Sequence, residues 1–166
     1  MFKLSLILQL LIPLWLTNAG FNIWSFIRKK YNLPDYSLDL NKKFFDQKRI
    51  FGDSKTMMGI PLSLILGCLS GLLIQKLNLG FILGISTYIG STISGFFKRR
   101  IGLKRGASFP VLDQSDYLIA AYSILNILNI NYFDNQTYIY AFFTTLIVHS
   151  LTNIITYKMG IRKYPW

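Results

Sequence analysis

The chain alternates between long apolar stretches and shorter segments that hold nearly all of its charge. Five apolar stretches stand out, at residues 4–27, 57–75, 79–97, 117–132 and 137–157. A helix needs about 20 residues to cross the hydrocarbon core of a bilayer, and four of the stretches reach or approach that length. The pattern therefore predicts an all-α integral membrane protein with five transmembrane helices. We expect one membrane-embedded domain over residues 1–166, with polar loops at 28–56 and 98–116.

The positive charges predict how these helices are oriented. Sixteen of the 18 Lys and Arg residues lie in the two loops and the C-terminal tail, and Lys3 and Lys76 are the other two. Cytoplasmic loops carry an excess of Lys and Arg. We therefore expect the N-terminus outside, the C-terminus in the cytoplasm and a multi-pass protein of the plasma membrane. An odd number of spans agrees with this arrangement.

The first apolar stretch has an alternative interpretation as a cleaved signal peptide, because Lys3, the apolar run and residues 17–19 imitate one. Cleavage would leave the cation-rich loop 28–56 outside, against the charge rule. The apolar run also continues to Ile27, so a spanning helix is favoured. Pro13 and Asn18 would then break or line that helix.

The net charge of +11 would indicate nucleic-acid binding in a soluble protein. Here the cations lie between spans, so membrane lipids with anionic headgroups and phosphorylated ligands are the expected partners, and nucleic acid is not. His149 is a lone intramembrane histidine and is interpreted as a packing residue. The sequence contains no Walker or Gly-x-Ser-x-Gly pattern, which argues against ATPase and serine-hydrolase chemistry.

The third stretch carries five hydroxyl residues shortly before its basic end, namely Ser86, Thr87, Ser91, Thr92 and Ser94. Small residues allow helices to approach closely in lipid. The same hydroxyls could instead line a polar cavity. The sequence alone leaves both interpretations open.

Two carboxylates open the fourth stretch. Asp113 and Asp116 are three residues apart, so they share one helix face. Capping the helix would need only one acid. Mg²⁺ commonly takes one or two carboxylates together with substrate phosphates. The pair therefore predicts a magnesium site.

Five cations precede this pair and are candidates to hold phosphate groups: Lys98, Arg99, Arg100, Lys104 and Arg105. A simple interaction with anionic lipid is the alternative, but the turn at Pro110 favours a shaped loop. A second candidate stretch, at residues 49–56, combines a glycine that permits close backbone approach with Asp53, Lys55 and Thr56. Taken alone this stretch is a weak signal, because ordinary turns have the same composition.

Four segments together resemble the CDP-archaeol synthase family, membrane cytidylyltransferases related to CDP-diacylglycerol synthases. They are residues 17–19, 49–59, 90–106 and 110–116. The resemblance implies transfer of a cytidylyl group from CTP to a lipid phosphate with release of pyrophosphate and use of Mg²⁺. The lipid would carry ether-linked isoprenoid or acyl chains, and the product would be a CDP-archaeol-like lipid.

The resemblance also implies roles for individual residues. Asp113, Asp116 and Lys98 would be catalytic. The nucleotide and its phosphates would be bound by Asp53, Lys55, Thr56, Arg99, Arg100, Lys104, Arg105 and Asn18. Metal ligands would be Asp113, Asp116 and Asp53, with Ser91 completing the shell.

One departure from the family pattern raises an alternative function. The family has Asp where this chain has Ser91, and Ser where it has Gly95. The chain could therefore be a weakened or repurposed member that binds nucleotide or anionic lipid. A transporter or assembly factor is a third hypothesis, disfavoured because few charges lie within the spans.

Overall fold

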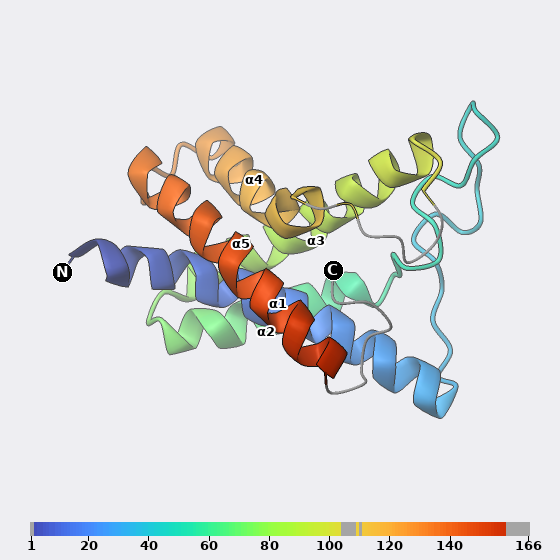
Figure 1. Cartoon of the computed structure of the whole chain (residues 1–166), viewed down its shortest axis with the longest axis horizontal. Helices are drawn as coiled ribbons and strands as arrows, with labels where there is room; N and C mark the ends of the chain where they lie inside the picture. The colour runs from blue at the N-terminus through green and yellow to red at the C-terminus, as the bar shows by residue number, and fades with distance from the viewer. Residues whose placement is uncertain (1, 104–108, 110, 159–166) are drawn as a thin grey trace.

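The computed structural model describes residues 2–103, 109 and 111–158 of the 166. Within these residues it contains five α-helices and no β-strand, and two isolated β-bridges lie in the loop before the second helix. The helices are α1 (Phe2–Tyr31), α2 (Gly59–Leu73), α3 (Leu77–Arg100), α4 (Leu112–Ile127) and α5 (Asn135–Lys158) (Figure 1). The all-helical class with five helices, predicted from the apolar pattern, is confirmed.

Two helices extend beyond their apolar stretches. α1 continues to Tyr31 and α3 to Arg100, so each ends in a turn that contains three cations. Cations near the C-terminus of a helix interact favourably with its dipole, which explains why the helices do not stop where the apolar run stops. By length and hydropathy, α1 and α3 are candidate membrane spans, whereas α2 is a shorter apolar helix of 15 residues.

The fourth helix is displaced from its apolar stretch. α4 begins at Leu112 and ends at Ile127, so Asp113 and Asp116 lie in its first two turns. The remainder of the stretch forms the connection to α5, whose start is capped by Asp134. The Asp134 carboxylate accepts a hydrogen bond of 2.8 Å from the backbone N–H of Thr137.

Glycines bring α2 and α3 into backbone contact. A Cβ atom built on Gly80 would lie 2.3 Å from the Cα of Gly71, and one on Gly84 would lie 2.7 Å from the Cα of Gly67. No side chain fits at either position, so the two helices pack as closely as small residues allow in lipid. We call these four residues the glycine seam.

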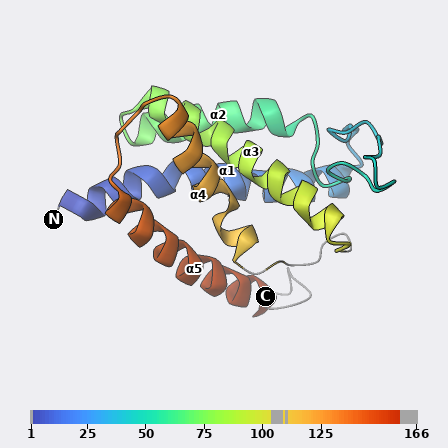
Figure 2. The same cartoon turned by 90° about the horizontal axis from the view of Figure 1, so that it is seen from above.

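The apolar core lies toward the N-terminal half of α1. Leu10, Leu11 and Leu14 are fully buried and pack in one cluster with residues of α3, α4 and α5. Figure 2 shows how these four helices are arranged. The opposite end of the molecule is polar. There the last turns of α1 and α3 meet the loop at 32–58, which folds over the end of the bundle (Figure 1).

Candidate active site at the polar end of the bundle

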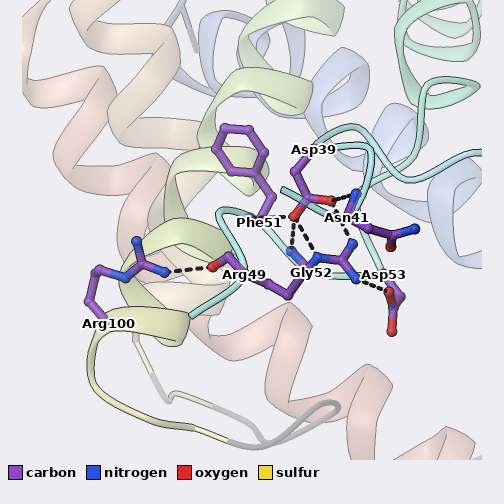
Figure 3. A network of polar contacts seen from close by, with 7 residues as sticks. All are labelled: Asp39, Asn41, Arg49, Phe51, Gly52, Asp53 and Arg100. Carbon is purple, nitrogen blue, oxygen red and sulfur yellow. Dashed lines mark hydrogen bonds and ion pairs between the residues drawn. The ribbon is translucent and has the colours of Figure 1, made fainter. Parts of the chain in front are cut away.

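The loop at 32–58 is organised around the buried carboxylate of Asp39 (Figure 3). Asp39 accepts hydrogen bonds of 3.0 Å from the backbone N–H groups of both Phe51 and Gly52, and one of 3.2 Å from that of Asn41. The Arg49 guanidinium donates two more, at 3.1 and 2.5 Å. Burial alone raises the pKa of Asp39, but the Arg49 guanidinium and the backbone donors hold that pKa well below its usual range.

This network fixes the turn that carries the second candidate stretch. Gly52 has a φ of +84°, which favours glycine, and its Cα faces the Arg99 side chain, whose Cδ would lie 3.5 Å from an added Cβ. The carboxylate of Asp53 is ion-paired to Arg49 at 2.9 Å and its side chain is 51% exposed. Asp53 also lines an outer cavity of about 310 Å³ together with Arg28. Asp53 thus lies in the loop, on the outer side of the turn.

Lys55 points the other way, into the bundle. Its side chain packs against Gly95, where an added Cβ would lie 3.1 Å from the lysine Cε. Burial lowers the pKa of Lys55, the carboxylates of Asp116 and Asp113 oppose this effect, and the charge of Lys98 adds to it. The ammonium group of Lys55 is therefore within electrostatic reach of both predicted carboxylates.

Lys98 and Asp113 form an ion pair between α3 and α4, with side chains that are 16% and 25% exposed. The Asp113 carboxylate also accepts a hydrogen bond of 3.0 Å from the backbone N–H of Phe109. Lys98 was predicted to hold phosphate, and here its partner is a carboxylate of the same site. The ion pair brings two of the predicted catalytic residues together.

Asp116 lies at a point where the backbones of α3 and α4 are in contact. Its carboxylate accepts a hydrogen bond of 2.7 Å from the backbone N–H of Tyr117, and the Ser94 side chain of α3 lies near it. A Cβ on Gly90 would lie 2.4 Å from the Asp116 carbonyl oxygen, so only glycine at that position allows this approach. We call Lys55, Lys98, Asp113 and Asp116 the Lys–Asp cluster.

Arg100 makes a different set of contacts. Its guanidinium donates to the Arg49 carbonyl oxygen at 2.5 Å (Figure 3) and is ion-paired to Asp46 at 3.0 Å. It also lies over the rings of Phe44 and Phe96, 5.0 and 4.7 Å from their centroids. These contacts attach the loop to the end of α3.

An inner cavity of about 50 Å³ lies between α1, the start of α2 and α3. Its polar lining consists of the cations Arg28 and Lys55 and the hydroxyl residues Ser25, Ser54, Thr56 and Ser91. Two predicted nucleotide-binding residues, Lys55 and Thr56, thus share a cavity with Ser91. The predicted residue Asn18 is partly buried in α1, one turn before Phe21, which lines the same cavity.

The hydroxyl residues of α3 divide between the two interpretations that the sequence left open. Ser86 and Thr87 donate to carbonyl oxygens of the preceding turn at 2.7 and 2.9 Å, as buried hydroxyls in membrane helices do. Ser91 also donates to such an oxygen, at 3.0 Å, but lines the inner cavity as well. Packing thus accounts for the first two, and the cavity-lining interpretation applies to Ser91.

The donor set suits magnesium better than a metal held by protein ligands alone. The described residues contain no group of three or more His, Cys, Asp or Glu placed to hold a metal ion. Two carboxylates with a neighbouring hydroxyl fit Mg²⁺, which usually keeps several waters and takes further oxygens from substrate phosphates. Two of the predicted phosphate-binding residues, Lys104 and Arg105, lie outside the described residues.

Asp39, Arg28 and Asp35, which is ion-paired to Arg28, are among the residues of this region that were not predicted from the sequence. The available signal was the presence of four aspartates among the eight cations of the loop at 28–56. Which cation each aspartate pairs with depends on how the loop folds. The residues next to each aspartate in the sequence do not reveal its partner.

Comparisons with known proteins show a similarity that covers most of the chain. A family model described as CarS-like CDP-archaeol synthase matches residues 33–166. The chain is 34% identical over 137 residues to the CDP-archaeol synthase of Sulfolobus acidocaldarius, covering 78% of this chain and 82% of that protein. It is 35% identical over 136 residues to the CDP-archaeol synthase of Methanopyrus kandleri, covering 78% and 79%.

A solved structure shares the fold. It is described as an intramembrane enzyme for archaeal membrane lipid biosynthesis, and it superposes with a TM-score of 0.70 at 23% sequence identity. The match covers 89% of this chain and 92% of the other. The five-helix arrangement is therefore shared with a protein embedded in a membrane.

Proposed function

The chain belongs to the CarS-like CDP-archaeol synthase family, and from this membership we propose that it is a CTP-dependent cytidylyltransferase. It transfers the cytidylyl group of CTP to a lipid phosphate and forms a CDP-archaeol-like lipid. The observation that carries the proposal is the Lys–Asp cluster at the edge of the inner cavity. The two ammonium groups of this cluster can bind the oxygens of a triphosphate, and the two carboxylates can bind the divalent cation that accompanies it.

In this reaction an oxygen of the acceptor phosphate forms a bond to the α-phosphorus of CTP. The bond from that phosphorus to the β-phosphate oxygen breaks, and pyrophosphate leaves with the electron pair. Both reactants are anions, so catalysis has to come mainly from positioning and from fixed positive charge. No general base is required, because the acceptor phosphate is already ionised near neutral pH.

Asp113 and Asp116 are the residues that would hold Mg²⁺, with Ser91 or Ser94 nearby. The ion, when bound, neutralises phosphate oxygens and supports the departure of pyrophosphate. Lys55 and Lys98 provide the remaining positive charge from the protein itself. Arg99, Lys104 and Arg105 stay candidates for the phosphate groups, and Asp53 stays a candidate ligand from the outer side of the turn.

The proposal includes a location. The protein spans the plasma membrane five times as a single domain, with its N-terminus outside and the polar end in the cytoplasm. The bias of Lys and Arg toward the loops supports this orientation. The lengths of α1 and α3 and the fold shared with an intramembrane enzyme support the membrane assignment.

The first experiment uses purified protein in detergent with Mg²⁺ and labelled CTP. Phosphatidic acid and a geranylgeranyl-ether glycerol phosphate are offered in parallel. We expect a CDP-lipid from at least one acceptor and none from the Asp116→Asn variant. The matched control is Asp134→Asn, at the start of α5, because asparagine also caps a helix. Wild-type turnover by Asp116→Asn would refute the assignment of the site.

The alternative of a non-catalytic relative is not favoured, because similarity to CDP-archaeol synthases covers most of both chains. The Ser91→Asp variant tests what remains of it. If the serine limits turnover, this variant raises the rate. If the wild type turns over at least as fast as Ser91→Asp, the serine is tolerated.

A further inference from the structure

We propose that the inner cavity binds the phosphate monoester of the acceptor lipid and that Arg28 is the residue that recognises it. The inference rests on the proposed cytidylyl transfer and names its acceptor subsite. Arg28 lies before residue 33, where the match to the family model begins.

The chemistry of the cavity lining selects an anion. Arg28 and Lys55 are the charged residues that line it, and no carboxylate is among its described lining residues. The hydroxyl groups of Ser25, Ser54 and Thr56 add hydrogen-bond donors that suit phosphate oxygens.

The size of the cavity favours a small group. A cavity needs a volume of about 10–15 Å³ to hold one water molecule. The inner cavity, at about 50 Å³, therefore holds a group of a few heavy atoms. A phosphate monoester fits this space. A nucleobase with its ribose does not fit without movement of the walls, which separates the acceptor from the nucleotide.

The carboxylate of Asp35 holds the Arg28 side chain in place. Its Nη1 donates to the Asp35 carboxylate at 3.3 Å, and the indole of Trp24 donates to the same oxygen at 3.1 Å. The side chains of Arg28 and Asp35 are 16% and 3% exposed. A guanidinium has five N–H groups, and the bond to Asp35 uses one of them. The others can form the bidentate hydrogen bonds to phosphate that are typical of arginine.

The position of Arg28 along α1 fits a lipid headgroup. It is the first charge after the apolar run at 4–27, so it lies where a spanning helix leaves the hydrocarbon core. The aromatic residues Phe21, Trp24 and Tyr88 line the same cavity. Aromatic side chains are enriched at this depth of a membrane. Here they can contact the apolar atoms of the lipid that lie next to its phosphate.

Lys55 connects this subsite to the Lys–Asp cluster. It lines the inner cavity and also interacts with Asp113 and Asp116. A phosphate bound by Arg28 and Lys55 would therefore lie next to the place where the triphosphate is expected. One lysine would then neutralise charge on both reactants at the point where they meet.

The test compares Michaelis constants for the two substrates. We expect Arg28→Gln to raise KM for the lipid phosphate by about tenfold or more, because a charge-assisted contact is lost. KM for CTP should stay within about twofold by the same reasoning, because the variant leaves the Lys–Asp cluster intact. The matched control is Lys29→Gln, an exposed neighbour that does not line the cavity, and it should change neither constant.

A second variant separates recognition from folding. Arg28→Gln leaves the Asp35 carboxylate buried without its cation, which can destabilise the protein. The double variant Arg28→Gln with Asp35→Asn removes both charges. We expect the double variant to unfold at the same temperature as the wild type. Its affinity for lipid phosphate should nevertheless remain as low as that of Arg28→Gln. Wild-type affinity in this double variant would overturn the inference.

Binding without turnover distinguishes this inference from the proposed function. Purified protein is titrated with a short-chain phosphatidic acid, with inorganic phosphate and with CTP and Mg²⁺. Binding is followed by tryptophan fluorescence, to which Trp24 in the cavity wall contributes. Loss of lipid-phosphate binding in Arg28→Gln with CTP binding intact supports the subsite, even if no CDP-lipid forms. Loss of CTP binding alone would assign the cavity to the nucleotide and overturn the inference.

Discussion

Two runs of three cations end α1 and α3 at the same end of the bundle, and they are used differently. In the run at 28–30, Arg28 faces the interior, while Lys29 and Lys30 are exposed. In the run at 98–100 every member has a partner within the protein. Lys98 pairs with Asp113, Arg99 lies over Gly52, and Arg100 is bound to the loop.

The difference follows from what covers each helix end. The loop at 32–58 folds over the end of α3 and supplies the Phe44 ring and the Asp46 carboxylate that contact Arg100. The second ring next to Arg100, that of Phe96, belongs to α3 itself. At the end of α1, Lys30 lies near the rings of Phe26 and Tyr31, 6.0 and 5.5 Å from their centroids. A basic run at a membrane boundary thus becomes part of a site only where other segments pack on it.

The largest difference in activity between the two runs should be found at Lys98, which belongs to the Lys–Asp cluster. Lys98→Ala is expected to lower kcat/KM by about 100-fold or more, because a fixed positive charge next to the phosphates is lost. Lys30→Ala, the control from the other run, should leave kcat/KM unchanged. Steady-state assays of CDP-lipid formation measure both. Equal, small effects of the two variants would mean that the run of α3 is no more than an orientation signal.

The next largest effect should be at Asp39, which organises the loop that covers α3. Asp39→Asn keeps the size of the side chain but loses the charge that faces Arg49, so we expect lower stability at neutral pH. Because the pKa of Asp39 is lowered in the folded protein, its contribution is complete above the unfolded value of 3.8 and declines as pH falls below it.

Denaturant unfolding between pH 7 and pH 3 measures this contribution. The wild type should lose stability toward the acid end, and the difference between wild type and Asp39→Asn should shrink there. Asp46→Asn is the control, since that carboxylate is more exposed and has fewer partners. A constant difference across the range would exclude titration of Asp39 as its cause.

A smaller effect should follow from Arg100→Lys, which keeps the charge but loses the planar guanidinium. We expect a loss of about 1–2 kcal/mol in the free energy of unfolding, because lysine cannot bond to Asp46 and the Arg49 carbonyl while stacking on two rings. The matched change in the other run, Lys30→Arg, should alter stability by less than about 0.5 kcal/mol. Similar values for both substitutions would contradict the structural role of Arg100.

The apolar pattern was sufficient to predict the helices, because each helix interior is apolar over most of its length. The helix ends were less accurate. α1 continues four residues past Ile27, since a helix can extend into water when its last turn carries cations. The sequence could not reveal this from hydropathy, which reports the end of the apolar run and not the end of the hydrogen-bonded backbone.

Within the site, the residues close in sequence were the easiest to predict. Asp113 and Asp116 share a helix turn, so their proximity follows from helical spacing. Lys55 meets them only because α2 and α3 pack together and Gly95 leaves room for its side chain. Arg28 and Asp39 act through partners that the folded loop brings to them, and no local pattern marks those pairs.

The glycine seam between α2 and α3 determines which wall of the inner cavity can move. Backbone meets backbone along the seam, and the Tyr88 hydroxyl donates to the Thr56 carbonyl oxygen at 2.7 Å near the cavity. We therefore expect the two helices to move together. α1 meets α2 differently, since Gly20 faces the flexible side chain of Leu66. We therefore expect the cavity to widen more easily at α1, the helix that carries Arg28, than between α2 and α3.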